Sequence, residues 1–490
     1  MPPVVSACSD RLTLATDARG SLHSLKPVLL FILSTLTTSA AVGPPGIQWT
    51  RESQGRATIA RPTKDGGYIV GGSYGDNYWV MKLGAEGNFL WQTLGNREGD
   101  EFEDPVVDVQ QTSDGGFIAL VETDPALDGF GREDCQVVRL NADGEVLWSR
   151  VFGADSQDWP KQIRQTPDGG YVFGASFNSG MIGNRTSPNY GDFDWWLVRL
   201  DAQGNKVSER SFCGTGADIF TTLVPTSDGG LVLLGRSSSE VSGNKTSPNQ
   251  GNADIWVVRL DDEDNKVWDK SFGGAGDEYA INVWEANGIL VVGGFSASFA
   301  SGNKTNPISG AWIIGLDGEG NKLWERVIAN AVRDLSVRAI LPADDGGFFL
   351  GGNFTRPAPT FCCELFHRLE RIGPADERTW ELVHLAGFFL ESLQRAPDGG
   401  LVVTGGASVF KTFPDALDAP PKLEAISMNA QSQRFTLTGA TNTDYAIERS
   451  LDLVSWNSIL TNRLFASQTQ MVVQGSSDLT RTFYRARVVR

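Results

Sequence analysis

Histidine is scarce in this chain of 490 residues, which contains only His23, His367 and His384. So few imidazoles leave little room for histidine-based acid–base catalysis or for a metal site with several histidine ligands. Positively charged residues are also few, since the chain has 42 Lys and Arg but 59 Asp and Glu, which gives a formal net charge of −17. Nucleic-acid binding needs a basic surface that neutralises phosphates, so we expect no nucleic-acid partner.

The overall composition excludes two further classes of protein. Charged residues make up 21% of the chain and hydrophobic residues 40%, which fits neither a disordered chain nor a bundle of membrane helices. The chain has 56 glycines and 10% aromatic residues. Together with frequent turn signals, this composition favours an all-β protein.

An apolar run occurs only near the beginning of the chain. Lys26 precedes Pro27 and the apolar stretch Val-Leu-Leu-Phe-Ile-Leu at residues 28–33, which leads to the small residues Ala40 and Ala41. This order is typical of a secretory signal peptide, so we expect residues 1–41 to be removed and the protein to be secreted or held at the cell surface. The run is too short for a transmembrane anchor. A buried N-terminal helix is the alternative interpretation.

Removal of that segment would leave four of the five cysteines, Cys135, Cys213, Cys362 and Cys363. Four cysteines in an exported chain allow three pairings, and the sequence does not choose among them. A bond between the adjacent Cys362 and Cys363 would close a strained ring, so free or differently paired thiols are equally compatible with the sequence.

A repeat organises most of the chain. One signal is an Asp-Gly-Gly turn followed by an apolar run, and it begins at Asp65, Asp114, Asp168, Asp228, Asp345 and Asp398, with a degenerate copy at Asn287-Gly288. A second signal is a Trp close behind a Gly/Asn turn, at Trp49, Trp91, Trp148, Trp268, Trp324 and Trp380, with Ser208 in the remaining place. Self-similarity of this length indicates a repeat architecture of seven units.

Each unit is predicted to contain four antiparallel strands, a to d. In the second unit the strands cover residues 105–112, 117–121, 135–140 and 146–152, and they show period-2 alternation and β-branched residues. One four-stranded sheet cannot bury both of its faces, and radial packing of such sheets solves this problem. We therefore predict a β-propeller.

The ends of the repeat indicate how the ring closes. The last unit begins at Asp398 and lacks the second turn and the Trp strand, whereas residues 46–51, at the start, look like an orphan copy of that strand. The sequence thus predicts a seven-bladed propeller over residues 46–415, closed by its N-terminal strand.

The repeat also resembles a family. The pattern Asp-Gly-Gly, then Asp254-Ile-Trp-Val-Val-Arg-Leu-Asp261, then Asn-Lys-x-Trp and Phe-Gly-Gly, resembles repeat proteins secreted by environmental bacteria, some of which carry endoglucanase-like names. The resemblance covers the propeller repeat and brings no defined catalytic motif. The Gly/Asn turns with their Trp also look like the Asp-box or quinoprotein docking turns of other propellers, which are structural.

Residues 422–490 form a separate predicted module. Alternating strands such as Tyr445-Ala-Ile-Glu-Arg-Ser450 and Phe483-Tyr-Arg-Ala-Arg-Val488 resemble the small β-sandwich at the end of many secreted bacterial proteins. Such a module could pack on the propeller, bind glycan or mediate cell-surface association. A plain spacer is the alternative.

Candidate binding residues follow from the topology. The a–b and c–d turns lie on one face of a propeller, here called the turn face, and the longer b–c and d–a loops lie on the other, the loop face. An acid recurs at the same offset in five d–a loops, at Asp100, Asp158, Asp218, Glu278 and Asp334, with aromatic neighbours that include Trp159 and Tyr279. We expect these acids to face the channel mouth, where a ring of carboxylates with aromatic neighbours could bind a cation or a sugar. The alternative is that each acid braces the next blade.

Three b–c loops are nearly identical. They place Asn184, Asn244 and Asn303 in Gly-Asn-(Arg/Lys)-Thr sequences on three adjacent blades. This indicates either a repeated binding surface or a stable turn inherited by duplication.

Two functions remain from the sequence. The first is an exported non-catalytic binding protein for a glycan or protein ligand on the loop face, with no cofactor or metal. The second is a polysaccharide-acting glycoside hydrolase that uses two loop-face carboxylates, since that reaction needs only paired acids. The near-identical loops favour binding over catalysis.

Overall fold

The computed structural model describes residues 45–95, 103–123, 133–178, 180–181, 183–286, 288–329, 336–357, 363–385, 389–414 and six strands between 422 and 488. The segment predicted as a signal peptide lies outside these residues, as do Asp100, Asp334 and Cys362. Every regular element in the described part is a β-strand. In that part of the chain, no helix has the length and apolar character needed to cross a membrane.

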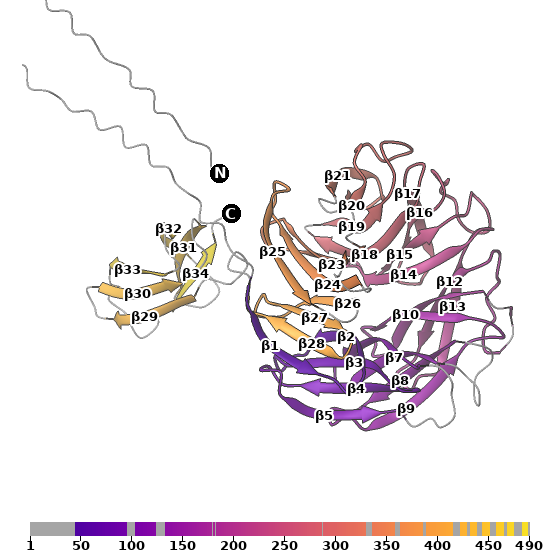
Figure 1. Cartoon of the computed structure of the whole chain (residues 1–490), viewed down its shortest axis with the longest axis horizontal. Helices are drawn as coiled ribbons and strands as arrows, with labels where there is room; N and C mark the ends of the chain where they lie inside the picture. The colour runs from indigo at the N-terminus through magenta and orange to yellow at the C-terminus, as the bar shows by residue number, and fades with distance from the viewer. Residues whose placement is uncertain are drawn as a thin grey trace, which may run out of the picture. The chain divides into compact units, whose positions relative to one another are not determined.

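Each repeat unit forms an antiparallel four-stranded sheet, and seven such sheets are arranged around a common centre (Figure 1). The strands of blades one to three are β2 (Arg56–Pro62), β3 (Tyr68–Tyr74), β4 (Asn77–Leu83), β5 (Phe89–Leu94), β6 (Val106–Gln111), β7 (Phe117–Thr123), β8 (Asp134–Leu140), β9 (Val146–Phe152), β10 (Asp158–Gln165), β11 (Tyr171–Phe177), β12 (Asp194–Leu200) and β13 (Lys206–Phe212).

Blades four to seven continue the same order. Their strands are β14 (Asp218–Pro225), β15 (Leu231–Ser237), β16 (Asp254–Leu260), β17 (Lys266–Phe272), β18 (Glu278–Ala286), β19 (Ile289–Ser296), β20 (Gly310–Leu316), β21 (Lys322–Ala329), β22 (Ser336–Pro342), β23 (Phe348–Pro357), β24 (Cys363–Ile372), β25 (Arg378–Leu385), β26 (Leu390–Arg395), β27 (Leu401–Gly405), β28 (Ser408–Thr412) and, from the N-terminal part of the chain, β1 (Ile47–Glu52).

The ring closes between the two ends of the repeat. Strand β1 pairs antiparallel with β28, with Trp49 opposite Lys411 and Glu52 opposite Ser408. The first strands of the blades contact one another in the order β2, β6, β10, β14, β18, β22 and β26, and β26 contacts β2 again. The seven-bladed propeller closed by an N-terminal strand is therefore confirmed.

Neighbouring blades bury each other's faces. All seven residues of β16 are buried, and the indole of Trp256 within it has no exposed surface. One apolar cluster joins Ile118 of blade two to Phe173 of blade three, and the other clusters also span neighbouring sheets. A sheet buried on both faces reads as a continuous apolar run, which explains the Trp-Val-Val pattern of the third strands.

In four blades the repeated Trp of the fourth strand packs on the c–d turn glycine of the next blade. The indole of Trp268 in blade four lies against Gly320, at the c–d turn of blade five, where an added Cβ would lie 2.9 Å from the ring. Gly320 also has φ of +77°, so the turn needs glycine for its backbone as well as for the close approach. The Trp268 indole N–H donates to Gly318 O at 2.9 Å. The same packing joins Trp49 to Gly87, Trp91 to Gly144 and Trp148 to Gly204.

The contact between blades three and four, here called a seam like the other contacts between neighbouring blades, lacks this Trp and is made in another way. Ser208 stands in the Trp position of blade three, and Asp264 replaces the turn glycine of blade four with φ of +63°. The Asp264 carboxylate accepts two hydrogen bonds from the Arg199 guanidinium of blade three, the longer at 2.6 Å. An ion pair thus replaces the aromatic contact at this seam.

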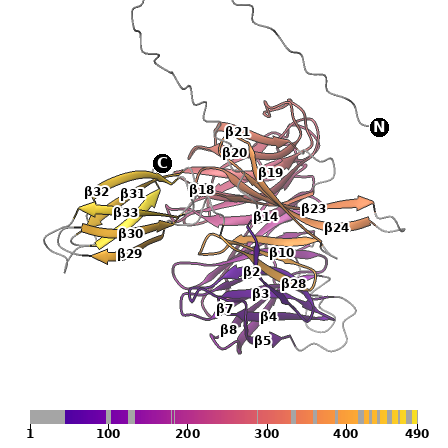
Figure 2. The same cartoon turned by 60° about the vertical axis from the view of Figure 1, so that its left-hand side comes forward.

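The C-terminal region contains two three-stranded antiparallel sheets, ordered β29-β30-β33 and β32-β31-β34. Their strands are β29 (Lys422–Met428), β30 (Ser432–Thr438), β31 (Thr443–Ser450), β32 (Asn457–Leu464), β33 (Gln468–Gln474) and β34 (Phe483–Val488), drawn in yellow tones in Figure 2. That the two sheets form a sandwich with the predicted domain boundaries stays a prediction.

Removal of residues 46–51 tests the closure. We expect the truncated protein to lose cooperative thermal unfolding or to aggregate, because the edge of β28 would be left unpaired. Differential scanning calorimetry measures this, with a deletion of residues 415–420 as the control. A truncated protein that unfolds like the intact one would show that the ring does not need its donated strand.

Trp268→Ala tests the contact between blades four and five. Because the indole is partly buried against Gly320, we expect a loss of about 2–4 kcal/mol in the free energy of unfolding, toward the low end of large-to-small substitutions. Urea unfolding measures it, with Val267→Ala as the control, since Val267 is 60% exposed on the same strand. Equal effects of the two substitutions would contradict the docking role.

Candidate functional site

The recurring acids of the d–a loops begin the first strand of a blade and are buried. Asp158, Asp218 and Glu278 have no exposed surface. Their backbone N–H groups donate to the preceding blade, at Glu133 O (2.8 Å), Phe193 O (2.6 Å) and Ala253 O (2.7 Å). The backbone at each acid therefore joins two blades.

The side chains of these acids bind the loop that leads into them. The carboxylates of Asp158, Asp218 and Glu278 each accept a hydrogen bond from the backbone N–H four residues earlier, at 2.8, 2.7 and 3.0 Å. Ser239 donates to Asp218 at 2.9 Å, and Ser296 donates to Glu278 at 2.7 Å. Equal offsets do give equivalent positions, and at these positions the three carboxyl groups are buried and bonded to the loop that precedes them. The geometry favours the bracing alternative for these three acids.

A second acid lies near each of these carboxylates. Asp194 and Asp254 begin the third strands of the preceding blades, and both are fully buried. A Cβ on Gly273 would lie 2.0 Å from Asp254 Oδ1 and 2.6 Å from Glu278 Oε2, so both carboxyls border this glycine. Burial raises the pKa of Asp194 and of Asp254 to about 7, and the charge of the neighbouring acid adds to this effect.

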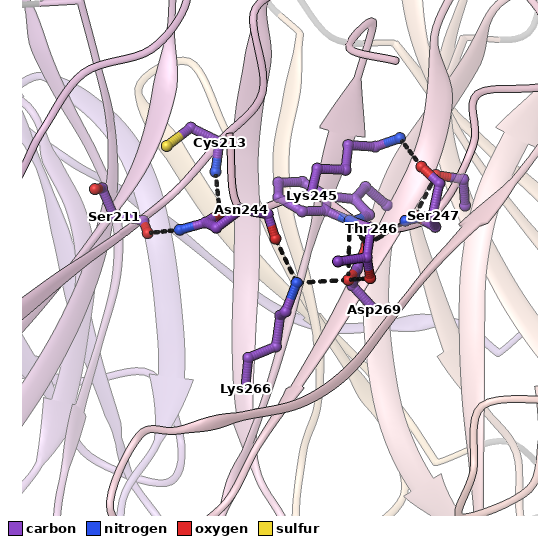
Figure 3. A network of polar contacts seen from close by, with 10 residues as sticks. Ser211, Cys213, Asn244, Lys245, Thr246, Ser247, Lys266 and Asp269 are labelled. Atoms are coloured by element: carbon purple, nitrogen blue, oxygen red, sulfur yellow. Dashed lines mark hydrogen bonds and ion pairs between the residues drawn. The ribbon is translucent and has the colours of Figure 1, made fainter. Parts of the chain in front are cut away.

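The three repeated asparagines also tie blades together. The side-chain amide of Asn244, in the b–c loop of blade four, accepts from Cys213 N–H at 2.9 Å and donates to Ser211 O at 2.7 Å, both at the end of blade three (Figure 3). Asn184 makes the same two contacts with Gly153 and Val151. Asn303 makes them with Gly273 and Ser271. These contacts favour the inherited-turn interpretation of the loops.

A buried acid on the fourth strand completes this arrangement. Asp269 accepts hydrogen bonds from Thr246 and Ser247 of the same loop, from Lys266 Nζ at 2.7 Å and from Trp256 Nε1 at 3.0 Å (Figure 3). Burial alone would raise the pKa of Asp269, but these hydrogen bonds outweigh it and hold the pKa well below its usual range.

The same network recurs in blades three and five. Glu209 accepts from Lys206 at 2.9 Å and Glu325 accepts from Lys322 at 2.8 Å, and the pKa of each acid is likewise lowered. The sequence signal for these residues is the recurring Asn-Lys-x-x-(Asp/Glu), whose acid is not among the predicted binding residues.

The two aromatic candidates lie in different surroundings. Trp159 stacks on Phe193 with ring centroids 4.3 Å apart, and its indole N–H donates to Glu133 at 2.5 Å. Tyr279 is 45% exposed, and the Arg236 guanidinium lies 4.6 Å from its ring centroid. Of the two, Tyr279 has the greater free surface for a ligand.

Tyr279 lines a cavity of about 490 Å³ at the loop-face end of the inner strands. The cavity belongs to blades four, five and six, and its wall consists of Thr221, Tyr279, Ala280, Ile281, Phe295, Ser336, Val337 and Arg338. Since β14, β18 and β22 are the first strands of their blades and contact one another in the ring, the cavity lies at the inner ends of these blades, and it is called the channel cavity below. Phe295 and Arg338 belong to no repeated motif, so the sequence offered no signal for them.

Other candidate chemistry is limited in the described part of the chain. There, no group of three or more His, Cys, Asp or Glu side chains is arranged to hold a metal ion. Cys135 and Cys213 are free, buried thiols, and burial raises the pKa of both.

Comparisons with known proteins find distant structural similarities and no match in sequence. No known protein family and no curated protein matches the sequence. A protein of unknown function from Bacteroides caccae is 13% identical, with a TM-score of 0.37 over 64% of this chain and 92% of that one. An ulvan lyase of a polysaccharide lyase family is 11% identical, with a TM-score of 0.40 over 76% and 95%. A puromycin hydrolase is 11% identical, with a TM-score of 0.43 over 81% and 62%. Similarities this low carry no functional argument.

Asp269→Asn tests the network of Figure 3. The pKa of Asp269 is lower in the folded protein than the ordinary 3.8, so its carboxylate stabilises the fold above that pH and ceases to do so as the pH falls below it. We expect a loss of about 3 kcal/mol in the free energy of unfolding at pH 7, and a smaller loss below pH of about 4.

The measurement is urea unfolding of variant and wild type at each pH. The raised pKa values of Asp194 and Asp254 have the opposite effect on the free energy of unfolding. The protonated carboxyls stabilise the fold at low pH, and this stabilisation is lost as the pH rises toward 7. The difference between the two proteins cancels this trend. Asp262→Asn, on the exposed turn of the same blade, is the control. A difference that does not change with pH would contradict the assignment.

Proposed function

We propose that the protein is an exported, non-catalytic binding protein that takes a glycan at the loop-face mouth of its channel. The observation that carries the proposal is the cavity of about 490 Å³, a size typical of small-ligand sites. Its wall combines the partly exposed rings of Tyr279 and Phe295 with the hydroxyl groups of Thr221 and Ser336. Aromatic faces that stack on sugar rings, with hydroxyls beside them, suit a carbohydrate.

The charge at this cavity favours an acidic sugar. Arg338 is exposed at the wall, and its guanidinium lies 5.9 Å from the Phe389 ring centroid. The other nearby guanidinium, of Arg236, is paired with Asp277 at 3.0 Å. Within the described residues no carboxylate pairs with Arg338, so its guanidinium is available to form an ion pair with a uronate or sulfate group of the ligand.

The alternative, a glycoside hydrolase, needs two carboxyl groups that reach the substrate. Asp158, Asp218 and Glu278 have no exposed surface and accept backbone hydrogen bonds, so they support bracing and not hydrolysis.

The proposal of export rests on the signal-peptide pattern of residues 26–41. The proposal of attachment to the cell surface through residues 422–490 rests on the resemblance of that module to the small β-sandwich of secreted bacterial proteins.

Tyr279→Ala tests this site. We expect it to weaken binding of an acidic polysaccharide, such as polygalacturonate, by about tenfold or more, because a stacking ring is removed. Affinity electrophoresis measures the binding, with Tyr74→Ala as the control, since Tyr74 is 53% exposed and does not line the cavity.

The outcomes distinguish the candidate functions. Absence of binding to every acidic and neutral polysaccharide tried would overturn the glycan proposal. Release of reducing ends during incubation would instead favour the hydrolase.

A further inference from the structure

A second cavity, of about 450 Å³, lies on the turn face between blades five and six. It shares no wall residue with the channel cavity. Two tryptophans, Trp284 and Trp324, form part of its wall, together with Phe348 and the turn that carries Asp344 and Asp345. This aromatic groove is built by three departures from the repeat that occur together in blades five and six.

The first departure is a missing ion pair. In five blades the Asp of the Asp-Gly-Gly turn pairs with a Lys or Arg near the end of the third strand at 2.5 to 2.9 Å: Asp65 with Lys82, Asp114 with Arg139, Asp228 with Arg259, Asp345 with Arg371 and Asp398 with Lys411. Blade five lacks both partners. Its sequence has Asn287-Gly288 in place of Asp-Gly-Gly, between the paired Ala286 and Ile289, and Gly315 stands where the cation would be.

The second departure concerns the Trp of the fourth strand. Trp324 is the cross-strand partner of Gly315, as Trp268 is of Arg259. A Cβ on Gly315 would lie 2.2 Å from the Trp324 ring. The indole therefore occupies the space that an arginine or lysine fills in other blades.

The third departure removes the glycine on which this Trp would dock. The c–d turn of blade six has Asp376, with φ of +68°, at that place. The Arg326 guanidinium forms an ion pair with Asp376 and donates to Gly373 O at 3.0 Å and to Gly346 O at 3.1 Å. This ion pair joins blades five and six, as the pair of Arg199 with Asp264 joins blades three and four. The indole of Trp324 therefore lines the groove instead of packing on a turn glycine.

The groove presents flat apolar faces and one open donor. Trp284 packs edge-on against Phe348 with ring centroids 6.3 Å apart, which fixes its ring. Both tryptophans are only partly buried. Among the described residues the indole N–H of Trp324 has no acceptor, whereas that of Trp268 donates to a carbonyl.

The charges at the rim are balanced. Arg326 is paired with Asp376, Asp345 with Arg371 at 2.7 Å, and Asp344 with Arg395 at 3.0 Å. These rim residues therefore offer no unpaired charge to an anionic or a cationic ligand. Indole faces, a free N–H donor and carboxylate oxygens that can still accept hydrogen bonds suit an uncharged ligand with an apolar face and hydroxyl groups.

We propose that this groove is a second binding site, on the turn face, for a neutral sugar ring of an oligosaccharide. The proposal does not depend on the channel cavity, since the two sites lie on opposite faces and have separate walls.

Isothermal titration calorimetry of the full chain tests the proposal with cellohexaose, xylohexaose, mannohexaose and laminarihexaose. We expect at least one of them to bind wild type and Tyr279→Ala equally, and Trp324→Ala to weaken that binding by about tenfold or more. Trp91→Ala is the matched control, because Trp91 is the equivalent Trp of blade one and is docked on Gly144. It should bind like wild type even if it is less stable.

Two further variants keep the test independent of folding defects. Trp324→Phe retains an aromatic face but loses the N–H donor, so an intermediate loss of affinity is expected. Gly315→Arg restores the residue type of the repeat and displaces the indole, so it should abolish binding.

Three results would overturn the proposal. They are no binding of any of the four sugars to wild type, equal binding to the Trp324→Ala variant, and binding of choline or polygalacturonate in this groove instead. Loss of binding in Tyr279→Ala alone would place the neutral sugar at the channel, whereas loss in Trp324→Ala alone supports the groove even if the channel binds nothing.

Discussion

Contact between neighbouring blades is the constraint on which this structure depends, because a four-stranded sheet with two apolar faces is stable only between two others. The fourth-strand Trp of one blade packs on the turn glycine of the next, as Trp268 does on Gly320. The inner contact is made by the acids that begin the first strands, since the backbone at Glu278 bonds to Ala253 of the preceding blade. The ring has no free start or end, because β1 completes the last blade.

This constraint changes how repeated polar residues are interpreted. Asn244 and Asp269 occur at the same place in three blades, as a ligand-binding surface would, yet each of their side chains is already bonded within the protein. A residue that recurs in every blade has the same neighbours in every blade, and in this propeller those neighbours are the adjoining sheet and loop. The polar residues that recur from blade to blade therefore hold neighbouring blades together. Binding surfaces are expected among residues that do not recur.

The sequence predicted the parts of the fold that follow from local pattern. Period-2 alternation, the Asp-Gly-Gly turns and the orphan strand at residues 46–51 were sufficient for seven blades and for their closure. The direction of the recurring acids was harder to predict, because a shift of one residue along a strand moves a side chain from the inside to the outside. The cavity residues Phe295 and Arg338 come from different blades and share no motif, so only the three-dimensional arrangement brings them together.

Blade five shows why departures from a repeat carry information. Loss of the turn acid alone would leave a buried cation without its partner, which is costly, and in blade five the cation is absent together with the acid, since Asn287 and Gly315 stand in their places. The indole of Trp324 lies over Gly315, and Asp376 stands where a docking glycine would be. Arg326 then holds the seam with Asp376. Each change is compatible with the fold because the others accompany it, and the aromatic groove is what the set of changes adds to an otherwise regular ring.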